Sequence, residues 1–390
     1  MSGRRPDPLP YDPEARRDTP LALKLKERIR REGTLSLPQY MAACLGDREH
    51  GYYSTRQPIG TAGDFVTAPE ISQTFGELLG LWCAVVWQQL GAPSRFRLIE
   101  LGPGRGTLLR DALRAARLVP GFLDAAQLSL VEIGSGMRAA QQAALEEAPL
   151  ARPPQWYESV TSIYFEDPAP LDEPAIVIGN EFLDTAPVFQ FLRHEDGWVS
   201  RRTGLDSGGR LAFTDTPSAV APRPLRPRAD TSLDALFPTA RPGEIVTRAH
   251  YELLDTDVVP FRRVAALFID YGHDAPVPGD TLQAVRAHAP EHPLTSPGEA
   301  DLTAQVDFSA IGRRIAGHGA GIAVDGPVTQ AEFLGRLGIV ERASRLMSAN
   351  PAKAAEIETG VARLMAVPGM GSRFKAIGVR SAHLPRLPGF

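Results

Sequence analysis

The sequence predicts an α/β protein built around a largely parallel β-sheet, and three observations lead to this prediction. Between residues 96 and 180, short apolar segments alternate with amphipathic helical segments, a pattern typical of βαβ units. A turn with three glycines joins the first apolar segment to the helical segment that follows, as in doubly wound folds. Finally, 43% of the 390 residues are hydrophobic and 23% are charged, which is ordinary for a chain that buries a core.

The elements follow one another along the chain. Helical periodicity predicts two N-terminal helices, the second with Ser36 as N-cap, and then a long buried helix; these cover residues 21–32, 36–45 and 72–90. Apolar runs predict the strands Phe96–Leu101, 128–133, Gln155–Tyr157, 175–179 and 264–270, with helices at 107–117 and 137–147. The C-terminal third is expected to be helical at 307–317, 329–337, 340–347 and 352–365. A last strand, 374–379, is expected to close the sheet.

An insertion interrupts this order. Three segments, at residues 188–193, 198–202 and 210–214, have the alternation of an antiparallel meander, and residues 207–209 (SGG) suit a hairpin turn. The stretch 216–243 is rich in Pro and Arg and is expected to be a loop. We therefore expect a disordered arm at 1–20, an N-terminal helical and lid region at 21–93, and a core at 94–390 with an insertion at about 188–260.

Charge, cysteine content and hydropathy exclude several classes of protein. Lys and Arg number 42 against 46 Asp and Glu, so we expect no nucleic-acid partner. Two cysteines, Cys44 and Cys83, cannot form a disulfide framework or a thiolate metal site, and we expect no metal. The N-terminus has neither the apolar stretch of a signal peptide nor the acid-poor composition of a transit peptide. The longest apolar run, 78–87, is too short to span a bilayer, so we expect a cytoplasmic protein without a membrane span.

The strongest local signal is the glycine turn at residues 100–107, ELGPGRGT. Its G-x-G-x-G spacing is one residue shorter than the G-x-G-x-x-G of dinucleotide sites, and an acidic residue precedes it. Such a turn is more typical of S-adenosylmethionine sites, and an acidic residue near the end of the next strand can accept the ribose hydroxyls. A tight turn without a ligand is the alternative. The candidate cofactor-binding residues are Glu100, Gly102, Pro103, Gly104, Gly106, Thr107 and Glu132.

An acidic loop follows the strand expected at residues 175–179. Ligands in open α/β sheets bind at the carboxyl ends of the strands, so Asn180, Glu181 and Asp184 are the candidate catalytic residues. Two carboxylates there suit a cationic substrate, and Phe182 is a candidate for lining the cleft. The alternative is that Asn180 and Asp184 only cap the turn.

Eight motifs dispersed along the chain carry a family resemblance. They are GDFVTAPEIS (63–72), ELGPGRGTLLRD (100–111), NEFLDTAPVFQF (180–191), FIDYGH (268–273), GDTLQAVRAH (279–288), PGEADLTAQVDF (297–308), TQAEFLGRLGI (329–339) and MGSRFKAIGV (370–379). With these motifs in this order, residues 35–379 resemble the MidA family of class I S-adenosylmethionine-dependent methyltransferases, which includes a mitochondrial complex I assembly factor.

The resemblance implies a Rossmann-like methyltransferase sheet with an N-terminal helical region, an inserted β-meander and C-terminal helices. It also implies S-adenosyl-L-methionine as cofactor and an arginine of a protein as acceptor, with a respiratory complex I subunit as the family's substrate. Gly63, Asp64 and Phe65 match the loop that is expected to close over the pocket. A homodimer is left open.

The chain departs from the family pattern at three places. Gln305 and Phe189 stand where family members have His, and Gly134-Ser135 stands where they have Ser-Pro. A histidine general base at either changed position is therefore excluded. Three other functions remain open at this point: a catalytically silent cofactor-binding assembly factor, a small-molecule methyltransferase, and an NAD enzyme. Neither a silent scaffold nor an NAD enzyme needs both the G-x-G-x-G turn and the acidic loop.

Overall fold

The computed structural model describes residues 15–56, 66–148, 150–166, 173–217, 232–249, 251–319 and 321–390. The chain divides into two compact units. The sheet unit comprises Gln57–Asp184, Tyr251–Asp274 and Phe308–Phe390, and the insertion unit comprises Met1–Arg56, Thr185–His250 and Ala275–Asp307. The expected region at 21–93 is therefore shared between the two units. The insertion unit also takes in residues 275–307, which were expected in the core.

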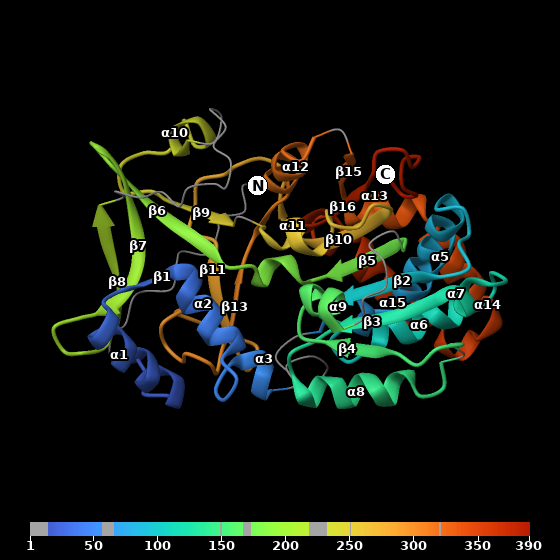
Figure 1. Ribbon diagram of the computed structural model, residues 1–390, viewed down its shortest axis with the longest axis horizontal. Helices are drawn as coiled ribbons and strands as arrows, with labels where there is room; N and C mark the ends of the chain where they lie inside the picture. The colour runs from blue at the N-terminus through green and yellow to red at the C-terminus, as the bar shows by residue number, and fades with distance from the viewer. Residues whose placement is uncertain are drawn as a thin grey trace. The chain divides into compact units, whose positions relative to one another are not determined.

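A mixed sheet with the strand order β15-β16-β10-β5-β2-β3-β4 forms the sheet unit (Figure 1). Its strands are β2 (Phe96–Leu101), β3 (Ala126–Val131), β4 (Gln155–Tyr157), β5 (Ala175–Asn180), β10 (Val264–His273), β15 (Ile322–Thr329) and β16 (Phe374–Ser381). Neighbours from β4 to β10 pair in parallel, whereas β16 is antiparallel to both of its neighbours. The predicted α/β class with a largely parallel sheet is confirmed.

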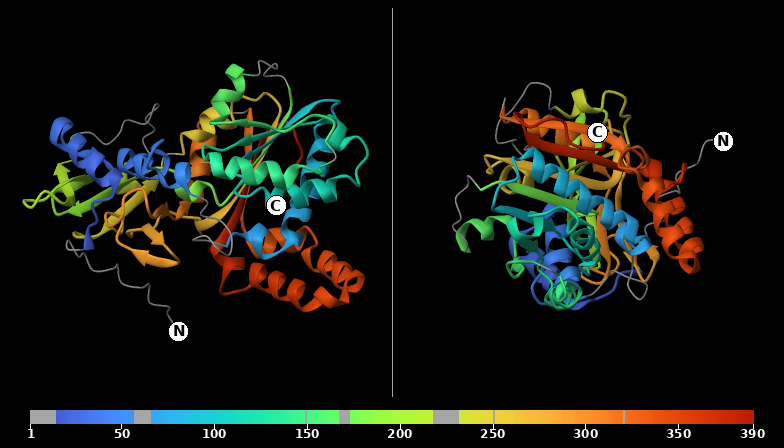
Figure 2. Two further views of the ribbon diagram at one scale, coloured as in Figure 1. Left: turned by 90° about the horizontal axis from the view of Figure 1, so that it is seen from below. Right: turned by 90° about the vertical axis from the view of Figure 1, so that its right-hand side faces the viewer.

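Helices lie on both faces of this sheet (Figures 1 and 2). The helices of this unit are α4 (Ala68–Ile71), α5 (Gln73–Gln89), α6 (Thr107–Ala116), α7 (Phe122–Ala125), α8 (Ser135–Leu145), α9 (Val160–Glu166), α11 (Leu253–Asp257), α12 (Phe308–Ala316), α13 (Gln330–Arg336), α14 (Ile339–Ala349), α15 (Ala354–Met365) and α16 (Met370–Arg373). The 3₁₀ turns η2 (Leu183–Thr185) and η3 (Pro351–Lys353) complete the list. Every residue of β2, β3 and β5 is buried, as expected for parallel strands covered on both sides. In the described part of the chain, no helix is long and apolar enough to cross a membrane.

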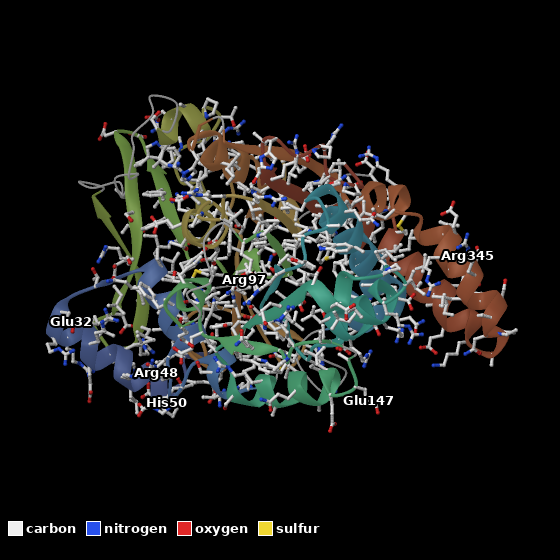
Figure 3. All side chains as sticks on the ribbon, turned by 45° about the vertical axis from the view of Figure 1, so that its right-hand side comes forward. Glu32, Arg48, His50, Arg97, Glu147 and Arg345 are labelled. Carbon is white, nitrogen blue, oxygen red and sulfur yellow. The ribbon has the colours of Figure 1, made fainter. Side chains whose placement is uncertain are left out.

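One charged residue lies inside the sheet. Arg97 of β2 is 2% exposed, and its Nε lies 2.9 Å from Oε2 of Glu173, so the buried guanidinium has a buried carboxylate beside it. Figure 3 shows Arg97 within the molecule and Glu147 and Arg345 at its periphery. Because Arg97 is near the amino end of β2, this ion pair lies at the opposite end of the strand from the glycine turn.

The edge of the sheet differs from the prediction. The last strand, β16, lies between β10 and β15 and does not close the sheet, and β15 was not predicted. The register of β15 against β16 shifts between Asp325 and Val328, around Gly326 and Pro327. A Gly-Pro pair within a strand removes the alternation by which strands are recognised, and Pro is tolerated at such an edge or bulge.

The insertion unit contains the predicted meander. One sheet has the order β1-β7-β6-β9 with β8 paired to β7, and a second has the order β12-β11-β13. The strands of these two sheets are β1 (Leu35–Ser36), β6 (Val188–His194), β7 (Gly197–Leu205), β8 (Leu211–Pro217), β9 (Ile245–Ala249), β11 (Leu282–Arg286), β12 (Ala289–Glu291) and β13 (Asp301–Ala304). The short strand β14 (Val306–Asp307) follows them in the chain and belongs to neither sheet. Its helices are α1 (Pro20–Glu32), α2 (Leu37–Gly46), α3 (Tyr52–Thr55) and α10 (Leu233–Leu236). The predicted N-cap Ser36 is confirmed, with a capping box to Gln39.

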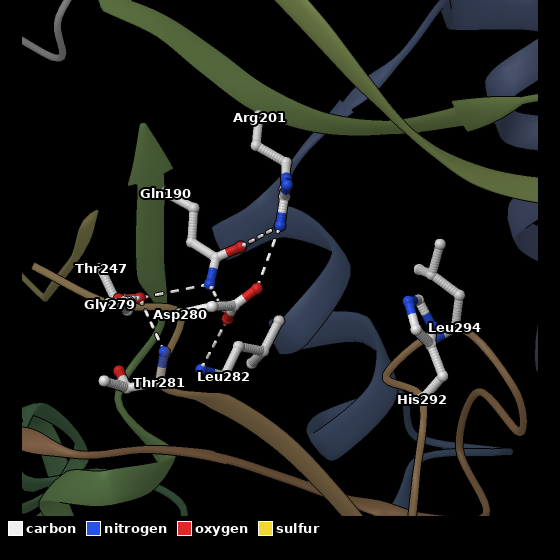
Figure 4. Close-up of polar contacts among 9 residues, drawn as sticks. All are labelled: Gln190, Arg201, Thr247, Gly279, Asp280, Thr281, Leu282, His292 and Leu294. Atoms are coloured by element: carbon white, nitrogen blue, oxygen red, sulfur yellow. Dashed lines mark hydrogen bonds and ion pairs between the residues drawn. The ribbon is translucent and has the colours of Figure 1, made fainter. Parts of the chain in front are cut away.

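A polar network holds the GDTLQ motif in this unit (Figure 4). The side-chain amide of Gln190, which is fully buried, donates to Asp280 Oδ1 at 2.6 Å and to Thr247 Oγ1 at 3.2 Å. Arg201 lies 3.1 Å from the other oxygen of Asp280. Because every partner lies on a different segment, the network fixes residues 279–282 against β6, β7 and β9. We assign this motif a structural role.

The second sheet of the insertion unit was not predicted, and its turn explains why. β11 and β12 form a hairpin through Ala287 and His288, whose φ angles are +51° and +62°. Left-handed turns are usually recognised by Gly or Asn, and neither residue occurs here.

His292 accepts a hydrogen bond from the Leu294 N–H at its Nδ1, and burial, together with Arg16 and Arg201, lowers its pKa to about 4. No group of three or more metal-ligating side chains occurs among the residues that the structure describes.

Close packing of α5 on α6 generates the first prediction. A Cβ at Gly80 would overlap the backbone of Ala112, and one at Gly76 would lie 2.8 Å from Asp111 Cβ. Gly80→Ala should therefore destabilise the protein by about 2 kcal/mol or more, because the helices must separate. Thermal unfolding followed by circular dichroism would measure this effect. As a matched control, Gly312→Ala in α12, where nothing lies within 4 Å, should stabilise by roughly 0.5–1 kcal/mol. Equal behaviour of the two variants would contradict close packing at Gly80.

Candidate active site

The glycine turn between β2 and α6 has the conformation that its sequence predicts. Gly102, Gly104 and Gly106 all lie in the left-handed region, with φ of +61°, +53° and +80°. The Gly102 N–H donates to Val131 O at 3.0 Å, and the Gly106 N–H donates to Pro103 O at 2.8 Å. The turn is therefore attached to β3 at its start and closed by a backbone hydrogen bond at its end, immediately before α6.

Neighbouring side chains pack tightly against this turn. A Cβ at Gly102 would lie 2.9 Å from Cδ2 of Phe182, which belongs to the acidic loop. A Cβ at Gly106 would lie 3.2 Å from both Cα of Gln141 and Cβ of Ala144 on α8. Each position therefore favours glycine for two reasons: its φ is positive, and a side chain there would meet a neighbouring residue. The contact with Phe182 also brings the two loops that were predicted separately next to each other.

Glu100 precedes the turn and is 3% exposed. Its Oε2 atom is buried and has no hydrogen-bond partner in the described part of the chain. Burial raises the pKa of this carboxyl to about 8. A buried acidic group without a partner is costly, so its presence indicates a site for a ligand that donates hydrogen bonds or carries positive charge.

Glu132 follows β3, and both of its carboxylate oxygens accept hydrogen bonds. Its Oε1 accepts from the Gly134 N–H at 2.7 Å, and its Oε2 accepts from Gln141 Nε2 at 3.1 Å. Burial raises the pKa of Glu132, while these two donors oppose that shift. The next residue, Ile133, is 45% exposed, so an apolar side chain stands in solvent beside the acid. Sequence reasoning did not single out Ile133 or Gln141.

The acidic loop begins where β5 ends, and it is strained. Glu181 has φ of +51°, which is unusual for a residue with a side chain. Its Oε1 accepts from the Ala68 N–H at 2.8 Å and from Asn180 Nδ2 at 3.3 Å. Burial raises its pKa to about 7; the Ala68 N–H lowers it, and the charge of Asp184 raises it further. The side-chain oxygen Oδ1 of Asn180 is buried and has no hydrogen-bond partner in the described ranges.

Asp270 on β10 accepts hydrogen bonds from the backbone of this loop. Its Oδ2 accepts from the N–H groups of Leu183 and Asp184, at 2.9 and 3.1 Å, and its Oδ1 accepts from the Tyr271 N–H at 2.8 Å. Asp270 is fully buried, and its pKa lies well above the ordinary value because of burial and of the charges on Asp184 and Glu181. Three carboxyl groups therefore gather at the carboxyl ends of β5 and β10. Asp270 shapes the turn, whereas Asp184 and Glu181 remain candidates for binding a cation.

The short helix α4 connects the two loops. Its first residue, Ala68, provides the N–H that binds Glu181, and Glu70 accepts from the Thr107 hydroxyl at 2.5 Å. A Cβ at Gly360 of α15 would lie 2.8 Å from Ile71 O, so α15 packs closely on α4. The sequence indicated this segment only as part of a mobile loop. Gly63, Asp64 and Phe65, the expected lid residues, lie outside the described residues.

Comparisons with known proteins agree with this geometry. Residues 78–328 match the model of a family described as S-adenosyl-L-methionine-dependent methyltransferases. Proteins named "Protein arginine methyltransferase NDUFAF7, mitochondrial" from Danio rerio and Homo sapiens are 32% and 33% identical. The aligned region covers 91% of this chain in both, and 85% and 82% of those proteins.

A solved structure extends the comparison. The crystal structure of a Burkholderia thailandensis protein bound to S-adenosyl-homocysteine has a TM-score of 0.78 and 28% identity, covering 98% of this chain and 97% of that one. The expectation of a cytoplasmic location is wrong, because the relatives from Danio rerio, Drosophila melanogaster and Homo sapiens are all named as mitochondrial. The fold, the glycine turn and these matches together show that the chain belongs to the MidA-like family and is an S-adenosyl-L-methionine-dependent methyltransferase.

Proposed function

We propose that this protein methylates an arginine side chain of a protein substrate, with the guanidinium bound by Glu181 and Asp184. The observation that carries the proposal is the pair of carboxyl groups on the loop that contacts the glycine turn through Phe182. The names of the curated relatives, protein arginine methyltransferases, support the same acceptor.

The residues around the glycine turn fit S-adenosyl-L-methionine. The three left-handed glycines turn the backbone sharply at the carboxyl end of β2, where ligands of open α/β sheets bind. The buried oxygen of Glu100 without a partner suits the α-ammonium group, and Glu132 suits the two ribose hydroxyls. Ile133 offers an apolar surface for the adenine ring. When bound, the cofactor supplies an electrophilic methyl group on a sulfonium.

Two carboxylates solve the problem that arginine presents as an acceptor. Its positive charge is delocalised over three nitrogens, which makes each of them a weak nucleophile. A carboxylate that bonds the planar fork bidentately localises the charge away from the attacking nitrogen and fixes its direction. Orienting two reacting groups in this way accounts for a large share of many enzymatic rate enhancements. The N–H groups of Leu183 and Asp184, which donate to Asp270, hold the loop in one shape despite the left-handed backbone at Glu181.

Glu181 also suits the proton balance of the reaction. When a guanidinium nitrogen gains a methyl group it loses a proton, so the product remains a monocation. A carboxyl group with a pKa of about 7 takes up this proton near neutral pH and releases it to solvent. This assignment needs no histidine, in agreement with Gln305 and Phe189 at the positions where family members have His.

The identity of the protein substrate is carried by the family resemblance alone. A subunit of respiratory complex I is the substrate that we propose on that basis. Assembly as a homodimer stays a prediction.

The carboxylate assignment predicts a loss of turnover. Glu181→Gln and Asp184→Asn keep the shape of each side chain and remove its charge. Each should lower the rate of arginine methylation by about 10²-fold or more, while affinity for the cofactor product changes little. Radiolabel transfer to an arginine-containing protein and calorimetry with S-adenosylhomocysteine would measure the two quantities. Glu356→Gln, at an exposed position on α15, serves as the control and should keep full activity.

The same assignment predicts a pH dependence. Below about pH 7 Glu181 is protonated in the free enzyme and cannot attract the guanidinium, so kcat/KM for the arginine substrate should rise between pH 6 and 8. Glu181→Gln should remove this rise. A variant that kept the same pH profile, or that lost cofactor binding together with activity, would show that Glu181 does not bind the acceptor.

Burial of Glu100 predicts the direction of a stability change in the absence of cofactor. Its pKa is about 8 when folded and close to 4.5 when unfolded, so unfolding releases a proton between these values and stability falls as pH rises through this window. Glu100→Gln should not lose stability over this range. Its free energy of unfolding should therefore rise by a few kcal/mol relative to that of the wild type when the pH goes from 5 to 8. Urea unfolding at both pH values would measure it.

Glu332 provides the control for that experiment. Its pKa lies below 4.5 because the Thr329 N–H and hydroxyl donate to it, so it is ionised in both folded and unfolded states at pH 5 and 8. Glu332→Gln should therefore change stability equally at the two pH values. If Glu100→Gln did the same, the carboxyl of Glu100 would be ionised in the folded protein.

A further inference from the structure

A buried glutamine connects the glycine turn to the acid after β3. Gln141 lies on α8 and is fully buried. Its Nε2 donates to the Gly104 carbonyl oxygen at 2.7 Å and to Glu132 Oε2 at 3.1 Å. Its Oε1 accepts from the indole N–H of Trp156 on β4 at 2.8 Å. A single side-chain amide therefore has both of its donors on candidate cofactor-binding residues.

Trp156 determines which way this amide points. An indole nitrogen donates only, so the group facing it must be the carboxamide oxygen of Gln141. The NH₂ group is thereby directed at Gly104 and Glu132, both of which accept. With the opposite orientation, two donors would face each other at Trp156 and two acceptors at each of the other contacts. The indole thus selects one of two otherwise similar arrangements.

The same glutamine acts on both parts of the site. Gly104 is the middle glycine of the turn, with φ of +53°, and the bond to its carbonyl oxygen restrains the peptide plane there. At Glu132, the Gly134 N–H donates to one carboxylate oxygen and Gln141 donates to the other, so the two donors together fix the plane of the carboxylate. The backbone of α8 at Gln141 also lies close to Gly106, so the helix packs directly on the end of the turn.

We propose that Gln141, oriented by Trp156, is a positioning residue that holds the glycine turn and the Glu132 carboxylate in one fixed geometry for the cofactor. This inference rests on the cofactor placement proposed above. It adds Gln141 and Trp156 to the site as residues that act through Gly104 and Glu132. Loss of the amide frees the Gly104 peptide and leaves Glu132 with one donor fewer, so the carboxylate both moves and protonates more readily.

Calorimetry with S-adenosylhomocysteine tests the proposal. Gln141→Met keeps the length of the side chain and removes its hydrogen bonds; it should weaken binding by roughly 10-fold or more. Trp156→Phe removes the N–H and should weaken binding by roughly 3-fold. Because Trp156 acts through Gln141, the double variant should bind no more weakly than Gln141→Met alone. A neighbouring residue, Gln142, is exposed on the same helix, and Gln142→Met is the matched control with unchanged affinity.

The pH dependence of binding separates positioning from general loss of structure. In Gln141→Met the affinity should fall more at the lower of two pH values than at the higher, because removal of a donor raises the pKa of Glu132 further. A variant that merely loosened the fold would lose the same factor at both pH values, which would overturn the proposal. Trp156 is only partly buried and lines a hollow of about 360 Å³ with Leu145 and Leu150, so Trp156→Phe should fold even if Gln141→Met does not.

One further variant distinguishes failure of this inference from failure of the proposed site. Glu132→Gln should itself weaken S-adenosylhomocysteine binding. If it does not, the cofactor placement is wrong. If Glu132→Gln weakens binding while Gln141→Met and Trp156→Phe match the Gln142→Met control, the placement stands and Gln141 has no positioning role.

Discussion

The parallel pairing of β3, β2, β5 and β10 is the constraint on which the rest of the site depends. Parallel strands end at the same edge of the sheet, so residues that follow three of these strands come together without being close in sequence. Glu100 and the glycine turn come from β2, Glu132 from β3, and Glu181 with Asp184 from β5. The registers are fixed by strands that are buried along their whole length, because a slip of one residue would turn each side chain to the opposite face.

Placing so many acids at one buried edge opposes stability. Glu100, Glu181 and Asp270 all have raised pKa values, and burial is the first cause in each case. The protein offsets this cost unevenly. Asp270 on β10 accepts from three backbone N–H groups, two of them in the acidic loop, whereas Glu100 has an oxygen without any partner in the described part of the chain. A structural carboxylate normally finds its hydrogen-bond partners within the protein, so Asp270 shapes the loop and Glu100 is a candidate for binding a ligand.

Two connections make the separate loops behave as one site. α4 binds Glu181 through the Ala68 N–H and Thr107 through Glu70, so the acidic loop and the start of α6 share one support. On the other side, Gln141 joins the glycine turn to Glu132. A further element supports each connection: α15 packs closely on α4 at Gly360, and Trp156 of β4 donates to Gln141. Support of this kind restricts the movement of the residues that form a site.

The sequence by itself determined the alternation of strands and helices from β2 to β5, the left-handed glycine turn, and the positions of the acids at strand ends. These features follow from local rules: the spacing of apolar residues, the φ that only glycine adopts readily, and the direction of a parallel strand. Only the tertiary structure decided which acids have hydrogen-bond partners and which residues provide them. Ala68 and Glu181 are 113 residues apart, and Gln141 and Gly104 are 37 apart. In the sequence, the adjacent residues Gln141 and Gln142 are the same; packing buries the first against Trp156 and leaves the second in solvent, because hydrogen-bond partners depend on which helix face meets the sheet.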